Sequence, residues 1–266
     1  MNNPKISIIL PLYNPVLKFF KLTLESIFKQ TYQQFEVIII DDSDSPILNK
    51  KVLSNFQEEK IIHYIPSKKL GLSKALNKGI SIAKGEFIAR FDADDIYDKK
   101  RLEIQLNFLV KNEYIDVCGT NCVKIDLNGN QIGLRKFPEK DKKIKQRLHL
   151  TNALAHPTLM IRKTFFDKYG NYSVHENIED YELWLRAKQN GCKFYNIQKN
   201  LCKLRVFEGN DFSRPRHWKD NFLLKLKYAD KKYPFSSING LIIFGFISLL
   251  PNKFAIVLQK LSNFIR

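Results

Sequence analysis

Three carboxylates are crowded into the four residues from Asp92 to Asp95, in the run FDADD that starts at Phe91. Their mutual repulsion makes such a cluster costly unless a cation offsets it. Mg²⁺ and Mn²⁺ take hard oxygen ligands of this kind and commonly bridge substrate phosphates as well. A solvated acidic turn before a helix would use the same residue types. Because other predicted strands also end in acids, we favour a divalent-metal site.

A second pair of acids, Asp41 and Asp42, ends the apolar run FEVIII. A carboxylate in this place can accept a hydrogen bond from a base imide or a ribose hydroxyl, which would suit a nucleoside. The alternative is a turn that caps the following helix. The pair alone does not decide between them.

A third acidic site lies in NIEDYELWLR, where Glu179 and Asp180 begin a predicted helix. Acids in a first helical turn are stabilised by the helix dipole, which would explain them without function. A carboxylate there could instead act as a general base that takes a proton from an attacking hydroxyl. Trp184, on the same segment, suits either the core or a stacking platform for a sugar.

Strand and helix patterns alternate through the first hundred residues, which predicts an α/β fold with a mostly parallel sheet and helices on both faces. Apolar runs predict strands at 6–12, 35–40, 61–65 and 87–91. Helical spacing predicts helices at 17–29, 46–56 and 72–83. Ligands of such sheets bind outside the carboxyl ends of the strands. We therefore expect Tyr13, Asn14 and the acids of the second and fourth strands to face one crevice.

The second half of the chain is less regular. We expect a strand at 115–125 that forms a hairpin through Asn128-Gly129 with 131–136, and a short strand at 157–161. Helices are predicted at 101–111, 142–150 and 179–189. The predicted organisation is a catalytic domain at 1–215, with a nucleotide-binding half at 1–105 and an acceptor-binding half at 106–215. A helical segment follows at 216–266.

Charge is the unusual bulk property, because 44 Lys and Arg residues against 27 acids give a net charge of +17 over 266 residues. Such an excess attracts nucleic acid, an anionic membrane or phosphate-rich substrates. The chain shows no nucleic-acid-binding module and no aromatics interleaved with its basic residues, so we expect no nucleic-acid partner. The four cysteines show no CxxC pair, which indicates buried free thiols in a reducing compartment.

The segment after Pro215 combines basic and apolar residues. Ile238–Leu250 is nearly all apolar but shorter than the ~20 residues that a spanning helix needs. Lysines at 219, 225, 227, 231 and 232 precede it, and Lys253, Lys260 and Arg266 follow. This pattern is typical of a segment that lies in a membrane interface. With no secretory signal at Met1–Lys5, we expect a cytoplasmic protein bound peripherally to the inner face of the membrane. A helix packed on the globular body is the alternative.

Five segments together resemble family 2 glycosyltransferases with the GT-A fold, notably bacterial transferases of capsule, exopolysaccharide and O-antigen assembly. They follow the family's order and spacing over roughly residues 5–212: ISIILPLYNP, QTYQQFEVIIIDDSD, LGLSKALNKGISIAKGEFIARFDADD, HPTLMIRK and EDYELWLR. The QxxRW motif of processive members is absent, which favours transfer of one sugar. The usual glycine after the second-strand acids is also missing.

The resemblance implies a role for each matching position. Asp180 would be the catalytic base, and Asp92 and Asp94 would bind Mn²⁺ or Mg²⁺ with support from Asp95. Asp41 would contact the uracil or its ribose. The remaining positions would line the nucleotide pocket or close over the diphosphate and the acceptor: Pro11, Tyr13, Asn14, Asp92, His156 and Arg205.

The activity that the resemblance implies is an inverting, metal-dependent transfer of one hexose from a UDP-sugar, with UDP-Glc or UDP-Gal favoured. The acceptor would be a polyprenyl-diphosphate-linked sugar such as GlcNAc-diphosphate-undecaprenol, and the product a β-glycoside. The alternatives are a nucleotidyltransferase, which would usually carry a glycine-rich phosphate loop near the first strand, and a basic nucleic-acid-binding protein. LPLYNP has no glycine at that loop.

Overall fold

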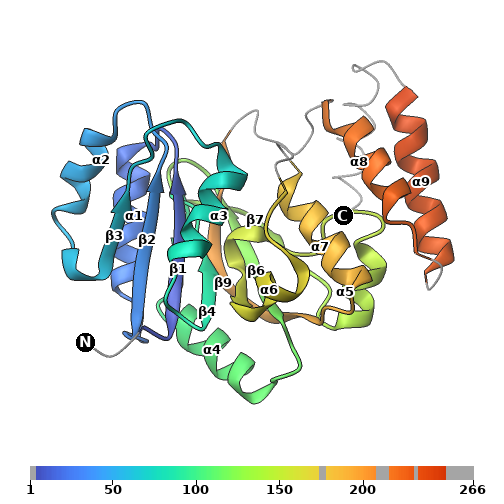
Figure 1. Cartoon of the computed structure of the whole chain (residues 1–266), viewed down its shortest axis with the longest axis horizontal. Coiled ribbons are helices and arrows are strands. Elements are labelled where there is room, and N and C mark those ends of the chain that lie inside the picture. Colours follow the sequence, from blue (N-terminus) through green and yellow to red (C-terminus); the bar gives the residue numbers. More distant parts are fainter. Residues whose placement is uncertain (1–3, 174–177, 208–215, 231–232, 250–266) are drawn as a thin grey trace.

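The computed structural model describes residues 4–173, 178–207, 216–230 and 233–249. A mixed nine-stranded sheet forms its centre, with the order β3-β2-β1-β4-β8-β6-β9-β5 and β7 paired to β6 (Figure 1). The strands are β1 Ile6–Leu12, β2 Phe35–Asp41, β3 Ile61–Tyr64, β4 Phe87–Arg90, β5 Ile96–Tyr97, β6 Val117–Ile125, β7 Gln131–Arg135, β8 Met160–Arg162 and β9 Phe194–Arg205. The helices are α1 Leu17–Phe28, α2 Pro46–Leu53, α3 Leu72–Ile82, α4 Arg101–Lys111, α5 Asp141–Arg147, α6 Thr164–Tyr169, α7 Glu179–Gln189, α8 Arg216–Lys227 and α9 Pro234–Leu249, with 3-10 turns η1 Glu58–Lys60 and η2 His156–Thr158.

The first half of the chain builds the parallel part of the sheet, as predicted. β1 pairs in parallel with β2 and β4, and β2 with β3. Both β1 and β2 are apolar along almost their whole length because helices cover both faces of the sheet. The chain runs outward from β1 to β3 and then returns to place β4 on the other side of β1. The carboxyl ends of β1 and β4 therefore form a topological switch point, where ligands of such sheets bind.

The second half extends the same sheet with mixed pairings. β8 is antiparallel to β4 and β6, and β9 is parallel to β6. The predicted strand at 157–161 is wrong in its first part. Pro157 lies in η2, where the Thr158 amide and hydroxyl both donate to the Ala155 carbonyl at 2.9 and 2.8 Å, and the strand begins only at Met160. The strands β5 and β9 and the helix α6 were not predicted.

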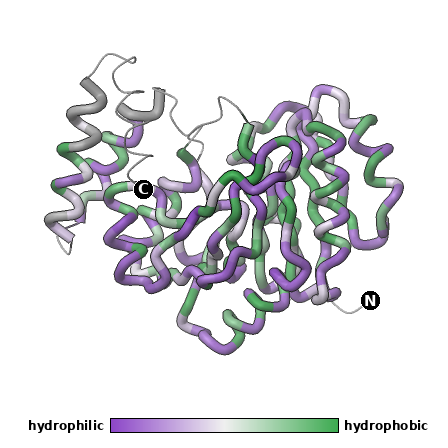
Figure 2. Tube along the Cα trace, turned by 180° about the vertical axis from the view of Figure 1, so that it is seen from behind, coloured by the Kyte–Doolittle hydropathy of each residue, from purple (hydrophilic) through white to green (hydrophobic). Residues whose placement is uncertain are grey.

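Two apolar layers hold the helices on the sheet. One layer packs α1 and α4 through side chains such as Phe20, Leu24 and Leu106. The opposite layer packs α3, α6 and α7, and it contains Trp184, whose exposed fraction is 0%. Trp184 is therefore a core residue rather than a stacking platform. Figure 2 shows the hydrophobic strands within the body and hydrophilic segments toward its outside.

The helices α8 and α9 form a hairpin that packs on the body beside α7 (Figure 1). Leu224 and Tyr228 of α8 belong to the same apolar layer as α7. Gly240 of α9 lies so close to the body that a Cβ there would be 2.2 Å from the His149 carbonyl oxygen. Within the described residues, no helix has both the length and the apolar character needed to cross a membrane. Lys231 and Lys232 of the predicted basic stretch, and the part of the predicted segment beyond residue 249, lie outside the described residues.

Buried polar contacts join this hairpin to α7. Lys225 Nζ donates to the Tyr181 hydroxyl at 2.5 Å, and the Tyr228 hydroxyl donates to Glu182 at 2.5 Å. Lys188 of α7 pairs with Asp230 at 3.1 Å. Burial lowers the pKa of Lys225 to about 7. The prediction that Lys225 belongs to a basic membrane-facing stretch is therefore wrong, because its side chain points into the protein and is only 4% exposed.

Candidate active site

The turn after β4 presents two acids and buries a third. Asp92 is half-buried and pairs with the Arg90 guanidinium at 2.6 Å. Asp95 is 1% exposed, and its carboxylate accepts the Arg205 backbone N–H at 2.9 Å. The Thr23 hydroxyl of α1 also donates to the Asp95 carbonyl at 2.7 Å. Asp95 therefore holds the turn in shape, and Asp92 and Asp94 are the carboxylates left partly exposed at its surface.

Asp92, Asp94 and Asp95 repel one another, and burial reduces the solvation of Asp94 and Asp95. Burial, followed by the neighbouring Asp92 charge, raises the pKa of Asp94 to about 6. The same two causes raise the pKa of Asp95 well above its usual value. A divalent cation beside Asp92 and Asp94 would relieve this repulsion, so the residue types fit one.

The protein alone does not supply a complete metal cage in the part of the chain that the structure describes. There, no group of three or more His, Cys, Asp and Glu side chains converges on one point. Mg²⁺-type sites commonly use one or two carboxylates and complete their shell with water and substrate phosphates. Asp92 and Asp94 match that pattern, in which a bound diphosphate would supply further ligands.

A small cavity of about 200 Å³ opens at the carboxyl ends of β1 and β2. Tyr13 lies on its rim, where Lys69 Nζ donates to the Tyr13 hydroxyl at 2.6 Å and lies over the ring. Asp42 holds the loop before α3, because its carboxylate accepts the Leu70 and Gly71 amides at 2.8 Å. The cavity is lined by Pro11, Leu12, Tyr13, Asp42, Lys69, Gly71, Leu72 and Ala75.

Asp41 lies beneath this cavity rather than on its lining, and it is 1% exposed. Asn49 donates to both of its carboxylate oxygens at 3.0 Å, and His63 Nε2 lies 2.9 Å from one of them. Burial would raise the pKa of Asp41, but hydrogen bonds from His63, Ser43 and Asn49 outweigh it and lower that pKa. A contact between the Asp41 carboxylate and a nucleoside would require these bonds to break. Of the two acids, Asp42 is the one that faces the cavity.

Asn14 connects the loop after β1 to the loop after β2. Its backbone φ of 45° lies in the left-handed region, which asparagine tolerates better than most residues. Its side chain donates to Asp44 at 2.6 Å and accepts the Asp44 amide at 3.0 Å. Its own amide donates to the Ser43 hydroxyl at 2.9 Å. Asn14 therefore sets the distance between two loops at the rim of the cavity.

The start of α7 brings two further acids to the same region. The Asn152 side chain donates to one oxygen of the Asp180 carboxylate at 2.8 Å, and the Tyr181 amide donates to the other at 2.6 Å. Burial raises the pKa of Asp180, although these two bonds and the charges of Arg135 and Arg90 limit the rise. Burial and the Asp180 charge raise the pKa of Glu179 to about 7. The Asp92 charge, from the turn after β4, also contributes to the rise in the pKa of Glu179.

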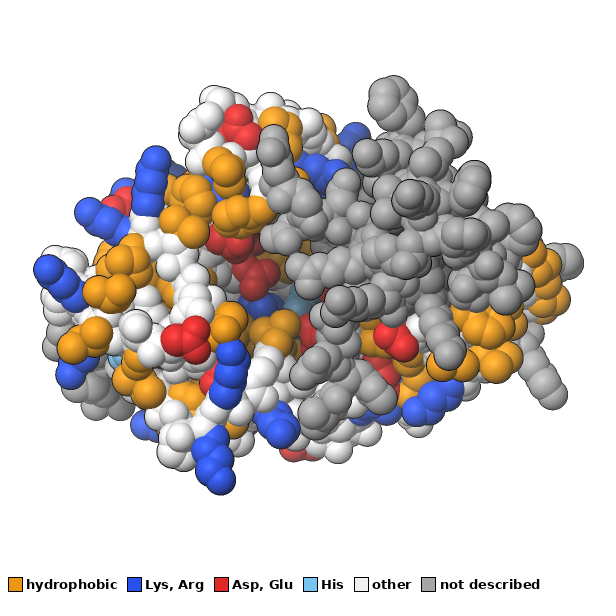
Figure 3. Space-filling view, turned by 90° about the horizontal axis from the view of Figure 1, so that it is seen from above, with side chains coloured by type: hydrophobic (Ala, Val, Ile, Leu, Met, Phe, Trp, Pro, Cys, Tyr) orange, Lys and Arg blue, Asp and Glu red, His pale blue; other side chains and the backbone are white. Residues whose placement is uncertain are grey.

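Arg90 also acts on a pair of rings, the partly buried His156 and the buried Tyr172. His156 Nε2 lies 2.8 Å from the Tyr172 hydroxyl. Burial and the nearby charge of Arg90 lower the pKa of His156 well below its usual value, so the imidazole is neutral at pH 7. Figure 3 shows the resulting hollow, in which acidic side chains gather next to a basic one and a histidine.

The Arg205 side chain binds backbone carbonyls of the acidic turn and of the 126–127 turn. Its Nε donates to the Asp94 carbonyl at 3.0 Å, and its Nη1 donates to the Asp126 and Leu127 carbonyls at 2.9 and 3.2 Å. The guanidinium also lies over the Phe19 ring at 4.0 Å from its centre. The sequence-based role of Arg205 was contact with the diphosphate. In this structure its described side-chain bonds go to backbone carbonyls of the protein.

Comparison with known proteins decides the family. Residues 7–170 match the profile of glycosyl transferase family 2. The O-antigen biosynthesis glycosyltransferase WbnJ of Escherichia coli is 36% identical over 193 residues, which cover 71% of this chain and 75% of the relative. The chain belongs to glycosyl transferase family 2.

Two further similarities extend over most of this glycosyltransferase. A UDP-Gal:alpha-D-GlcNAc-diphosphoundecaprenol beta-1,3-galactosyltransferase of Escherichia coli is 30% identical over 209 residues, covering 77% of this chain and 75% of the relative. Among solved structures, S. aureus TarS 1-349 in complex with UDP-GlcNAc has a TM-score of 0.67 at 21% identity and covers 90% of this chain and 71% of that one.

A mannosyltransferase from Pyrobaculum calidifontis, in complex with GDP-Man and Mn2+, has a TM-score of 0.66 at 17% identity. It covers 96% of this chain and 72% of the solved chain. At these identities the two structures establish the fold. The predicted GT-A fold is thus confirmed for this family 2 glycosyltransferase.

Asn152, which the sequence did not single out, donates a hydrogen bond to the carboxylate of the candidate base Asp180. We expect Asn152→Ala to lower kcat by about tenfold and to move the acidic limb of the kcat–pH profile to higher pH. The Asn152 side chain donates to the ionised Asp180 carboxylate and lowers its pKa, so losing the bond raises that pKa. The measurement is a pH profile of sugar transfer, with Asn171→Ala as an exposed control. An unshifted acidic limb would show that Asn152 does not act on the base.

Proposed function

We propose that this family 2 glycosyltransferase moves one hexose from a UDP-sugar to a polyprenyl-diphosphate-linked sugar, with inversion at the anomeric carbon. UDP-Glc and UDP-Gal are the favoured donors, and GlcNAc-diphosphate-undecaprenol is the favoured acceptor. The product is a β-linked disaccharide for assembly of an O-antigen, capsule or exopolysaccharide repeat. The names of the O-antigen relative and of the galactosyltransferase relative support this choice of pathway and acceptor.

One observation carries the proposal. Arg90 pairs with Asp92 of the turn after β4 at 2.6 Å, and its charge also lowers the pKa of Glu179 and Asp180 at the start of α7, so both groups of acids share one cation. A cavity opens at the carboxyl ends of β1 and β2, and β1 pairs with β4. A nucleotide bound in that cavity would extend its diphosphate toward Asp92 and Asp94. The sugar would then lie between this turn and Asp180, where an acceptor hydroxyl can approach.

The chain's own residues divide the work of transfer. Asp42 and Tyr13 contact the nucleoside, and Asp92 and Asp94 are the residues that would hold Mn²⁺ or Mg²⁺. When bound, the cation supplies Lewis-acid stabilisation of the UDP leaving group. Asp180 accepts the proton of the acceptor hydroxyl, whose oxygen forms the new bond to the anomeric carbon while the bond to UDP breaks. A single displacement inverts the configuration, so an α-linked donor gives a β-glycoside.

The test is a donor screen with purified protein and a synthetic GlcNAc-diphosphate-lipid acceptor. Each nucleotide sugar is supplied with Mn²⁺ or Mg²⁺, and both released nucleotide and glycosylated lipid are measured. We expect a UDP-hexose to give a disaccharide-lipid whose new linkage is β by NMR. Transfer only from GDP-linked donors, or an α-linkage, would overturn the donor or the stereochemistry respectively.

We also propose that the enzyme works on the inner face of the cytoplasmic membrane, which it contacts through the α8–α9 hairpin. One side of the hairpin is buried against α7, but four large apolar side chains on it are 51–63% exposed. They are paired three or four residues apart on each helix, so each helix carries them on one face. These residues are Leu223 and Leu226 of α8, and Ile238 and Ile242 of α9.

We expect Leu226→Glu together with Ile242→Glu to abolish flotation with anionic liposomes at low salt, because both changes place a charge on the apolar membrane-facing side. Point variants are preferable to deletion of the segment. Deletion would remove Leu224 and Tyr228 and so expose the apolar surface of α7 on which they pack. The control is Ile47→Glu, which adds the same charge at a 75% exposed position on α2. Equal flotation of the double variant and the control would refute this contact surface.

A further inference from the structure

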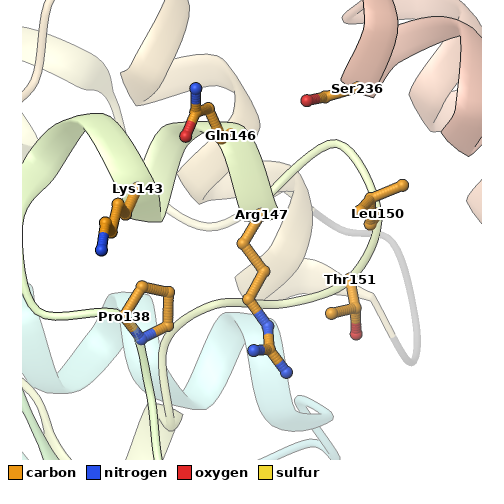
Figure 4. Close-up of a pocket in the computed structure, with 7 residues that line it drawn as sticks. All are labelled: Pro138, Lys143, Gln146, Arg147, Leu150, Thr151 and Ser236. Atoms are coloured by element: carbon orange, nitrogen blue, oxygen red, sulfur yellow. The ribbon is translucent and has the colours of Figure 1, made fainter.

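A second and larger cavity, of about 600 Å³, lies between α5 and the α8–α9 hairpin. Figure 4 shows three lining side chains that come from α5, with Ser236 of α9 across the gap. The walls are formed by Pro138, Lys143, Gln146, Arg147, Leu150, Thr151 and Ser236. We call it the α5–α9 groove.

The lining of the groove combines two cations with apolar surface. Lys143 is exposed and Arg147 is partly exposed, one turn apart on α5. Among the residues that the structure describes, no acidic side chain lines the groove. Pro138 and Leu150 contribute apolar walls, and the Gln146, Thr151 and Ser236 side chains contribute hydrogen-bonding groups. A ligand with this complementarity carries a compact negative charge joined to an apolar chain.

The groove is connected to the candidate base through a short piece of chain. Its lining residue Thr151 is followed directly by Asn152, whose side chain holds the Asp180 carboxylate at 2.8 Å. On its other side, the groove is walled by the α9 residue Ser236. Ile238 and Ile242, two of the apolar residues placed at the membrane above, follow on the same helix and are 53% and 63% exposed. The groove thus adjoins both the loop that holds the proposed base and the helix that carries two of the proposed membrane-facing residues.

We propose that the α5–α9 groove binds the diphosphate of the lipid-linked acceptor, with Lys143 and Arg147 contacting the phosphates and the first isoprenoid units lying toward α9. This inference rests on the proposed function, because it places the acceptor of that reaction. A diphosphate held here is joined to the acceptor sugar, whose hydroxyl faces Asp180. The membrane-embedded remainder of the lipid then leaves past Ile238 and Ile242.

The direct test measures binding of farnesyl diphosphate, a short water-soluble polyprenyl diphosphate, by isothermal titration calorimetry. UDP and Mn²⁺ are present at saturation so that the nucleotide site is filled. Loss of a charge-assisted contact is worth about tenfold in affinity, so Lys143→Glu and Arg147→Gln should each raise the Kd by about that factor. The matched control is Lys142→Glu, an exposed lysine on the same helix that does not line the groove.

Two further ligands measure separately how much the diphosphate and the isoprenoid chain contribute to binding. Inorganic pyrophosphate tests the charge alone, and farnesol tests the chain alone; both should bind more weakly than farnesyl diphosphate. Farnesyl diphosphate binding that is unchanged in Lys143→Glu and Arg147→Gln would overturn the proposal. Equal weakening by Lys142→Glu would also overturn it, because a general charge effect would then explain the result.

A kinetic arm distinguishes failure of this inference from failure of the proposed function. The wild type and Lys143→Glu are compared on GlcNAc-diphosphate-lipid and on a phosphate-free alkyl GlcNAc. We expect KM to rise about tenfold for the first acceptor only, with kcat and donor KM unchanged. Equal KM changes for both acceptors would refute diphosphate binding in the groove, and the proposed transferase function would stand. Absence of wild-type transfer to either acceptor would refute the proposed function and the groove with it.

Discussion

Asp180→Asn should lower kcat for sugar transfer by on the order of 10²–10⁴ while leaving the Kd for UDP nearly unchanged. General-base catalysis is worth about this factor, and asparagine matches the shape of aspartate but cannot accept a proton. Burial already raises the pKa of Asp180, which makes its ionised carboxylate a stronger base than an exposed aspartate. Single-turnover kinetics with a saturating donor would measure the loss directly.

The neighbouring acid supplies the control for this experiment. Glu179→Gln makes the same change of carboxylate to amide one residue earlier on α7, at a side chain that is 7% exposed. We expect this variant to retain most of its kcat. If Glu179→Gln loses the rate and Asp180→Asn does not, the base is Glu179, and Asp180 serves only to start the helix.

Asp94→Asn should reduce transfer to background in the presence of Mn²⁺ or Mg²⁺ and yet stabilise the metal-free protein at pH 7–8. Activity falls because one of the two carboxylates that would hold the cation is lost. Wild-type activity should likewise vanish in excess EDTA and return with Mn²⁺. The control is Glu113→Gln, which neutralises an exposed carboxylate in the loop after α4. Full turnover in EDTA would refute the metal requirement.

The stability gain should depend on pH with a definite sign. Burial and the Asp92 charge raise the pKa of Asp94 to about 6 in the folded protein, from an ordinary value of 3.8. A carboxyl group whose folded pKa is raised favours folding while protonated, and that contribution is lost as pH rises through the folded value. The free energy of unfolding of Asp94→Asn should therefore exceed that of the wild type by on the order of 1–3 kcal/mol at pH 7–8. Below pH 4 the two proteins should unfold alike; urea titrations in EDTA measure both.

The elements that bring the acids together were predictable because their sequence signals are local. β1, β2 and β4 are continuous apolar runs that end in polar residues, and the crevice at their carboxyl ends follows from parallel pairing. β9 was not predicted because its sequence, with the buried Asn196 and with two lysines and one glutamine, lacks the alternation of a half-buried strand. Its burial depends on β6 and β5, which lie far away in the sequence.

The roles of individual site residues depended on details that no local pattern contains. Asp41 and Asp42 are adjacent acids, and successive side chains of a strand point in opposite directions, so only the three-dimensional register shows that Asp42 faces the cavity. Asn152 lies 28 residues before Asp180 in an irregular loop. The family resemblance implied that Arg205 closes over the diphosphate and the acceptor, and no local pattern shows that the carbonyls of the 126–127 turn and the acidic turn engage its guanidinium.

The docking of the α8–α9 hairpin on α7 has a consequence for how the enzyme matures during synthesis. Residues 6–90 contain every strand of the parallel half, so a nascent chain can assemble the nucleotide side early. The helix that carries Asp180 gets its hydrogen-bonding partners Lys225 and Tyr228 only after a further 45 or so residues have been made. A ribosome-stalled chain released before α8 would therefore bind donor without transferring its sugar.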